Sequence, residues 1–233
     1  MVTEQKLELP LHLVEARNFL GKTVTDPYGR VLGRLVGVTT NVRDETTTVE
    51  IESGKGDFEE VQSKQLRVNG ESLVVLPWWK LEAEEFRKEF ELVTRRTRAL
   101  DELFSLGDID GEIYQDLRKL HEDSIANLKG RRKLLLDSLQ TRTANLFSQT
   151  RQLQTHLANN KMLHAAGEVD DFAYKTAVDI IDAGLTRSSA EKRDIEAISS
   201  FLKRLESMHL EQVSSQASET GQPSILTVHV REE

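Results

Sequence analysis

Two groups of basic residues are the strongest candidates for a chemical role in this chain. Both stand in otherwise acidic surroundings: Arg95, Arg96 and Arg98, and then Lys129, Arg131, Arg132 and Lys133. Clustered arginine and lysine side chains bind the phosphates of nucleic acids or of lipid headgroups. On a helix, the same pattern also describes a solvated face whose charges pair with acidic neighbours. The sequence leaves both interpretations open.

No group of residues has the spacing of a catalytic or metal site. The six histidines, at positions 12, 121, 156, 164, 209 and 229, lack the close spacing of metal ligands, and the chain has no cysteine. Metal sites and nucleophilic catalysis both need close sets of His, Cys, Asp or Glu side chains. The sequence therefore predicts a protein that is not an enzyme and has no cofactor.

The composition suits a small core attached to long solvated helices. The chain has 233 residues, of which 38% are hydrophobic and 30% charged, and its net charge is −8. This acidity argues against salt-driven DNA binding by the whole surface. The first residues, MVTEQKLELP, lack the pattern of a signal peptide, and no apolar run is long enough to span a membrane. Membrane contact is therefore expected to be peripheral.

Residues 78–213 show the apolar rhythm of a coiled coil. Apolar residues recur at alternating steps of three and four, as in Phe86, Phe90 and Val93. Such a narrow seam requires a partner helix, and we expect self-association because helices this long exceed what one hairpin covers. Some seam positions are polar: Thr97, Arg132, Arg142 and Gln149.

A repeat at an offset of 60 residues marks two corners between these helices. In each copy glycine ends one helix in the left-handed conformation, aspartate caps the next, and tyrosine packs one turn later. The corner residues are Gly107, Asp110 and Tyr114, and then Gly167, Asp170 and Tyr174. They predict antiparallel helices over about 78–106, 110–165 and 170–212. Ala183-Gly184, followed by Ser188 and Glu191 at capping-box spacing, predicts an interruption of the third helix.

Residues 1–77 have the pattern of a small β domain. Alternating and β-branched stretches over 30–40 and 47–52 predict strands, and Asp26-Pro27-Tyr28-Gly29, Gly54-Lys55-Gly56 and Asn69-Gly70 predict tight turns. Five or six short strands in this space favour a small barrel or a meander. Beyond Pro77, the pair Trp78-Trp79 is expected to pack the first helix on the barrel, the alternative being an anchor at a membrane interface.

The glycine and turn pattern of this β domain resembles the PRC-barrel domain. The resemblance covers most of residues 17–77 and rests on Phe19-Leu20-Gly21-Lys22, Val24, Asp26, Gly29, Leu32-Gly33, Leu35 and the closing Leu73-Val74-Val75-Leu76-Pro77. It implies an adaptor or interaction module rather than an enzyme.

The C-terminal residues change character twice. Residues 214–223 are polar and predict a flexible linker, whereas residues 224–233 form a strand-like peptide. A lone strand after helices is expected to add to a sheet of another protein, the alternative being the sheet of its own head. The predicted partner-binding residues are Ile225, Leu226, Thr227, Val228, His229 and Val230.

Taken in order, the α+β arrangement of barrel, coiled coil, linker and terminal strand resembles the CdvA family of archaeal cell-division proteins. The resemblance spans essentially the whole chain, and residues 225–230 are similar to the ESCRT-III-binding peptide of that family. It implies a cytoplasmic scaffold that forms filaments at the inner membrane face at mid-cell. It also implies recruitment of the ESCRT-III homologue CdvB through strand addition to a winged-helix domain, and contact with membrane or DNA. The alternative function is a PRC-barrel adaptor that binds RNA, DNA or a ribosomal client through its basic helix faces.

Overall fold

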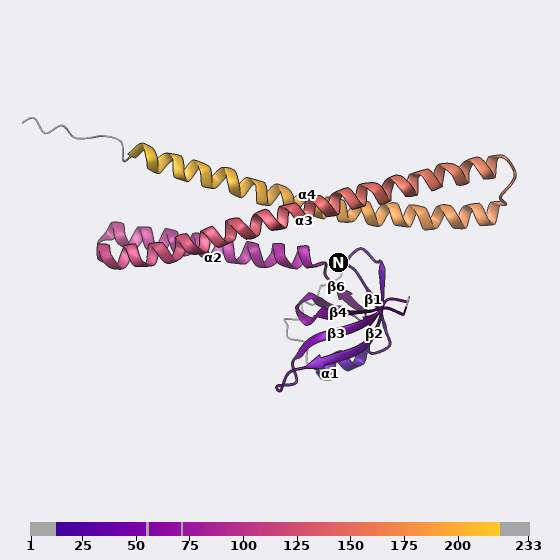
Figure 1. Ribbon diagram of the computed structural model, residues 1–233, viewed down its shortest axis with the longest axis horizontal. Coiled ribbons are helices and arrows are strands. Elements are labelled where there is room, and N and C mark those ends of the chain that lie inside the picture. Colours follow the sequence, from indigo (N-terminus) through magenta and orange to yellow (C-terminus); the bar gives the residue numbers. More distant parts are fainter. Residues whose placement is uncertain (1–12, 55, 71, 220–233) are drawn as a thin grey trace, which may run out of the picture.

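The computed structural model describes residues 13–54, 56–70 and 72–219 (Figure 1). A β-rich head comes first and three long helices follow it. The head begins with α1 (Leu13–Ala16) and the 3-10 turn η1 (Arg17–Phe19). Its strands are β1 (Thr23–Thr25), β2 (Val31–Thr40), β3 (Thr46–Glu52), β4 (Phe58–Gln62), β5 (Leu66–Asn69) and β6 (Ser72–Val75), with the 3-10 turn η2 (Ser63–Gln65) between β4 and β5.

The six strands form one open mixed sheet in the order β4-β3-β2-β1-β6-β5. Neighbouring strands are antiparallel except β1 and β6, which are parallel. The predicted strand number is confirmed, but the predicted closed barrel is not, because β4 and β5 remain as edges. Only the three residues of η2 join these two edges. The sheet must therefore curl strongly, since so few residues span about 10 Å, yet within residues 13–54, 56–70 and 72–219 no strand pairing closes it.

The core of the head lies on one face of this sheet. Val24, Leu35, Ile51 and Leu73 are at most 2% exposed, and Phe19 from η1 packs with them. Their alternation with exposed residues reflects the two-residue period of a strand. A side chain at Gly33 of β2 would place its Cβ 2.0 Å from the Glu52 carbonyl oxygen of β3. That glycine therefore serves close strand packing.

The predicted helices form with nearly the predicted bounds. They are α2 (Trp78–Leu106), α3 (Gly111–Ala165) and α4 (Asp171–Glu219). Helix α4 runs unbroken through Ala183-Gly184, so the predicted interruption is wrong. It also continues to Glu219, so the first part of the predicted linker, residues 214–219, is helical. The predicted partner-binding residues 225–230 lie outside the described residues.

The helices share a core where all three run together. Trp79, Phe86, Leu139 and Leu202 lie in this core with at most 4% exposure, and Tyr28 of the head packs against it. Helix α3 has 55 residues and is about 80 Å long at 1.5 Å per residue. Figure 1 shows the consequence: a two-helix arm of α2 and α3 projects on one side, and an arm of α3 and α4 projects on the other.

Both predicted corners are confirmed. Gly107 and Gly167 end their helices with φ values of 76° and 74°. The Asp108 N–H donates to the Leu103 carbonyl at 3.0 Å, which closes the helix end as in a Schellman motif. Asp110 accepts hydrogen bonds from two backbone N–H groups at the start of α3, and Asp170 accepts one from Ala173 at 2.8 Å.

Each corner also contains an aromatic stack that the sequence repeat did not reveal. Tyr114 stacks on Phe104 and Tyr174 stacks on His164, with ring centroids 4.2 Å apart in both pairs. Phe104 and His164 occupy equivalent positions, three residues before the corner glycine. They differ in type, and this difference concealed the match in the sequence. The stacks join the two helices of each corner through side chains as well as backbone.

Candidate functional site

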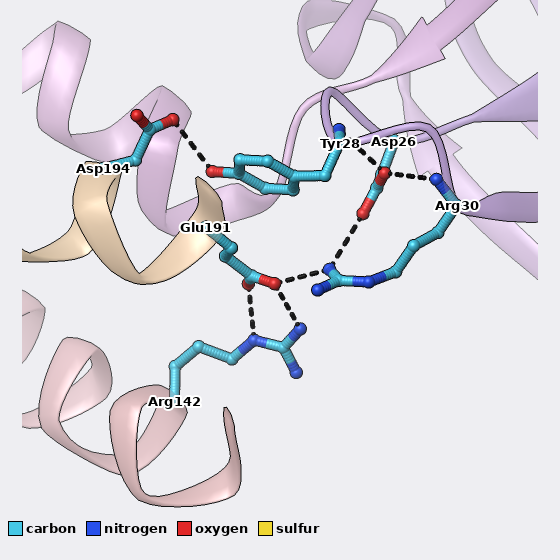
Figure 2. A network of polar contacts seen from close by, with 6 residues as sticks. All are labelled: Asp26, Tyr28, Arg30, Arg142, Glu191 and Asp194. Carbon is cyan, nitrogen blue, oxygen red and sulfur yellow. Dashed lines mark hydrogen bonds and ion pairs between the residues drawn. The ribbon is translucent and has the colours of Figure 1, made fainter. Parts of the chain in front are cut away.

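The head contacts the helices through the turn between β1 and β2. The Asp26 carboxylate accepts hydrogen bonds from the backbone N–H groups of Tyr28 and Arg30, at 2.9 and 2.8 Å. This is the turn predicted from Asp-Pro-x-Gly, and the aspartate side chain fixes its shape. The turn therefore presents the Tyr28 ring and the Arg30 guanidinium on the same side, toward α3 and α4 (Figure 2).

Glu191 of α4 is the centre of the contact. Its carboxylate is 1% exposed and accepts hydrogen bonds from Arg142 of α3 at 2.6 and 2.9 Å. Arg30 of the head, which also pairs with Asp26, donates to the same carboxylate (Figure 2). Burial opposes ionisation of Glu191, but the hydrogen bonds from the two arginines outweigh it and lower its pKa. One carboxylate thus joins the head, α3 and α4.

A second set of contacts lies one helical turn further along α4. The Tyr28 hydroxyl donates to Asp194 at 3.0 Å, and Lys80 of α2 donates to the same carboxylate at 2.6 Å. Burial, followed by the hydrogen bond to Asp194, raises the pKa of Tyr28 well above its ordinary value. Burial opposes ionisation of Asp194, but the hydrogen bond from Lys80 prevails and lowers its pKa. Tyr28 therefore stays protonated and acts as a donor.

This network replaces the capping box predicted from Ser188 and Glu191. A capping box needs free backbone N–H groups at the beginning of a helix, whereas both residues lie deep within α4 and are buried. The Arg142–Glu191 pair also explains a polar position in the predicted apolar seam. The clue in the sequence was a seam arginine on one helix and a glutamate on another, but nothing in the spacing links residues so far apart.

Two of the four residues of the second basic cluster form internal contacts. Arg131 pairs with Glu82 and Glu89 of α2, at 2.8 Å for Glu82. Arg132 donates to the Leu202 carbonyl of α4 at 3.3 Å. Lys129 and Lys133 are exposed. Arg131 therefore fits the interpretation of charges that pair with acidic neighbours, whereas Lys129 and Lys133 leave the interpretation of a phosphate-binding surface open.

The first basic cluster differs in this respect. Arg95, Arg96 and Arg98 of α2 are all exposed. Across the described ranges 13–54, 56–70 and 72–219, none of the three forms an ion pair. Their charge is available to an external partner.

The two adjacent tryptophans, Trp78 and Trp79, differ in burial. Trp79 is 4% exposed and lies in the core of the three helices, whereas Trp78 is 52% exposed. Trp79 thus packs the start of α2 into the helical core, which Tyr28 of the head also contacts, and not into the core of the sheet as predicted. No helix in the described part of the chain combines the length and hydrophobicity needed to cross a membrane. Among the same residues, no group of three His, Asp or Glu side chains is placed to hold a metal ion.

Comparisons with known proteins agree on one family. A family model described as the CdvA-like coiled-coil domain matches residues 78–224. Cell division protein A of Sulfolobus acidocaldarius is 27% identical over 178 residues, which cover 76% of this chain and 74% of that protein. No solved structure matches. Because the family model covers well over half of the sequence, the chain belongs to the CdvA-like family.

Proposed function

We propose that this protein is a non-enzymatic cell-division scaffold that assembles through its helices and recruits an ESCRT-III homologue, CdvB, through its C-terminal peptide. The observation that carries the proposal is the family match over the helical body, together with a relative named as a cell division protein. The described residues support a scaffold rather than a catalyst: their buried charges join the head to the helices. Assembly is proposed to occur in the cytoplasm, at the inner membrane face at mid-cell.

The recruiting element of the proposal is the peptide of residues 225–230. Its apolar residues Leu226, Val228 and Val230 alternate with Thr227 and His229, the pattern of a strand that buries one face. Strand addition gives affinity through backbone hydrogen bonds, and the alternate side chains fix the register. Many peptides on one polymer raise the effective concentration, so that a weak individual contact recruits firmly.

Calorimetric titration tests the recruitment directly. The peptide of residues 223–233 is titrated into the ESCRT-III homologue with and without its winged-helix segment. Saturable binding that requires this segment supports the proposal. Absence of binding at high micromolar peptide contradicts it, and the alternative of pairing with the sheet of its own head then becomes the first to examine.

Val228→Asp should abolish partner binding by the full chain and leave its assembly intact. The reason is that strand addition would bury a charge with no partner, which is far more costly than losing two methyl groups. Pull-down of the ESCRT-III homologue measures binding, and sedimentation measures assembly. Thr227→Asp, which places the same charge on the other face of the strand, is the matched control. Undiminished binding by Val228→Asp would refute this strand register.

A further inference from the structure

Exposed apolar side chains gather at the end of the arm formed by α2 and α3. Leu103 and Leu106 close α2, and Ile113, Leu117 and Leu120 open α3. Their exposed fractions range from 40% to 68%. Single exposed apolar residues are ordinary on a protein surface, but a contiguous group of them marks an interaction site. These five side chains form such a group only if they lie on the same face of the arm.

The contacts of Arg131 show that Leu103 and Leu117 lie on the same flank of the arm. Arg131 of α3 reaches Glu82 and Glu89 of α2 across one side of the helix pair. Leu103 follows Glu89 by two seven-residue repeats, and Leu117 precedes Arg131 by two. Positions related by whole repeats keep the same orientation in a coiled coil. The two leucines therefore continue the flank that Arg131 defines.

The other three residues extend this flank into a face. Leu106 follows Leu103 by three positions, Ile113 precedes Leu117 by four, and Leu120 follows it by three, and such spacings make neighbours on a helix surface. Helix α4 does not share this side, because Arg132, next to Arg131, turns to the Leu202 carbonyl of α4 instead. In Figure 1 the C-terminal part of α4 diverges from the arm. We call these five residues the arm face.

Opposite charges border the arm face. On α2, Arg96 lies one repeat after Glu89 on the same flank, and Arg95 is beside it. On α3, Asp116 and Asp123 lie beside Leu117 and Leu120. All four are exposed, and within the described part of the chain they form no ion pair. On the opposite flank, by contrast, Arg118 pairs with Asp101 at 2.7 Å. Glu102 is also exposed beside Leu103, so the α2 side of the arm face has two positive charges against one negative charge, whereas the two charges named on its α3 side are both negative.

We propose that a second copy of this chain docks on the arm face, with α2 of each copy over α3 of the other. Leu103 and Leu106 would then cover Ile113, Leu117 and Leu120 of the partner copy, twice by symmetry. The α2 side of each copy, with its excess of positive charge, would meet the α3 side of the other. A surface that is its own complement suits an isologous contact. The inference rests on the proposed self-assembly and identifies the surface that carries it.

Sedimentation velocity of the full chain over a range of concentrations tests the contact. Leu117→Glu should weaken self-association by about tenfold or more, because it buries a charge at the centre of the interface. The circular dichroism of its helices should not change. Phe147→Glu is the control: Phe147 is also on α3 and is 69% exposed, but it lies 16 residues beyond Arg131, which already pairs with Glu82 near the start of α2. Unchanged association of Leu117→Glu, or equal weakening by the control, would overturn the proposal.

The charges allow an independent test. Arg96→Glu and Asp123→Arg should each weaken self-association, and the chain that carries both should recover it, because each new charge again meets its opposite in the partner copy. Additive weakening in the double variant would overturn the α2-over-α3 arrangement. Binding to anionic liposomes is measured in parallel. If Leu117→Glu loses liposome binding but keeps self-association, lipid occupies the arm face and a second copy does not.

Failure here is distinguishable from failure of the proposed recruitment. Leu117→Glu should still bind the ESCRT-III homologue through its C-terminal peptide, measured per chain by calorimetry. A wild-type chain that stays monomeric would overturn both the arm contact and the proposed polymer. Failure of peptide binding with self-association intact would leave the arm contact standing.

Discussion

Glu191→Gln is expected to lower the free energy of unfolding by about 3–5 kcal/mol, the usual cost of removing one partner from a buried ion pair. The wild-type carboxylate is 1% exposed and satisfies both Arg142 and Arg30. The amide keeps the shape of the side chain but carries no charge. Two guanidinium groups would then face each other in a partly buried space without their shared counter-ion.

Chemical denaturation monitored by circular dichroism measures this loss. Glu196→Gln is a suitable control, because Glu196 lies on the same helix, is 59% exposed and, among the described residues, pairs only with Lys192 at 3.6 Å. Exposed pairs of this kind contribute about 0–1 kcal/mol. If the two variants lose the same stability, Glu191 is not the anchor between head and helices.

The same carboxylate gives stability a defined pH dependence. The folded state lowers the pKa of Glu191 below its ordinary value of 4.5, so the unfolded chain takes up its proton first as the pH falls. The Glu191 contribution is therefore fully present above about pH 4.5 and is lost as the pH falls through the lower pKa of the folded state. Glu191→Gln should lack this component, so the two stability curves should converge at low pH. A constant difference down to pH 2 would contradict the argument.

The junction also fixes the direction in which the head faces. Tyr28 and Arg30 come from one short turn and bind two carboxylates of α4, which Lys80 of α2 and Arg142 of α3 also bind. A scaffold that polymerises through its helices would therefore repeat its heads at a set orientation along the polymer. The buried charges therefore have a specific role, which is to fix the orientation of the head relative to the helices. An apolar contact would hold the head as firmly, but it would restrict that orientation less.

Helix bounds were largely predictable from the sequence because they depend on local chemistry. Pro77 begins α2, Gly107 ends it, and Asp110 caps α3, each through the backbone of its immediate neighbours. The CdvA-like assignment was likewise available from the order of segments. The interruption expected at Ala183-Gly184 did not form, because packing outweighs the weak helix propensity of one glycine: Leu153 of α3 lies against Gly184.

The junction and the openness of the sheet were not predictable in the same way. Arg30 and Glu191 are 161 residues apart, and no spacing rule joins them. Polar residues in the seam, such as Arg142, signalled that buried partners exist but not which ones. Closure of the sheet depends on pairing between β4 and β5, whereas turn signals such as Asn69-Gly70 report only hairpins between strands that are adjacent in the chain.

Phe86→Ala should have a similarly large effect, about 3–5 kcal/mol, through loss of packing rather than charge. Phe86 of α2 is 1% exposed and fills the core where three helices meet. Its ring stacks with that of Phe90, with the ring centroids 6.2 Å apart. Phe147→Ala is the control, because Phe147 is 69% exposed on α3 and should change stability by no more than about 0.5 kcal/mol. The head has its own separate core around Leu35 and Leu73.

Native-state hydrogen exchange of Phe86→Ala should therefore show a regional response. For amides in α2 and in the facing part of α3, the free energy of opening should fall by as much as the free energy of unfolding falls, because their packing depends on this ring. Amides in β2 and β3 should lose less protection, since no described side chain of α2, α3 or α4 belongs to the core of the head. Uniform loss across head and helices would mean instead that the junction at Glu191 couples the two cores into one cooperative unit.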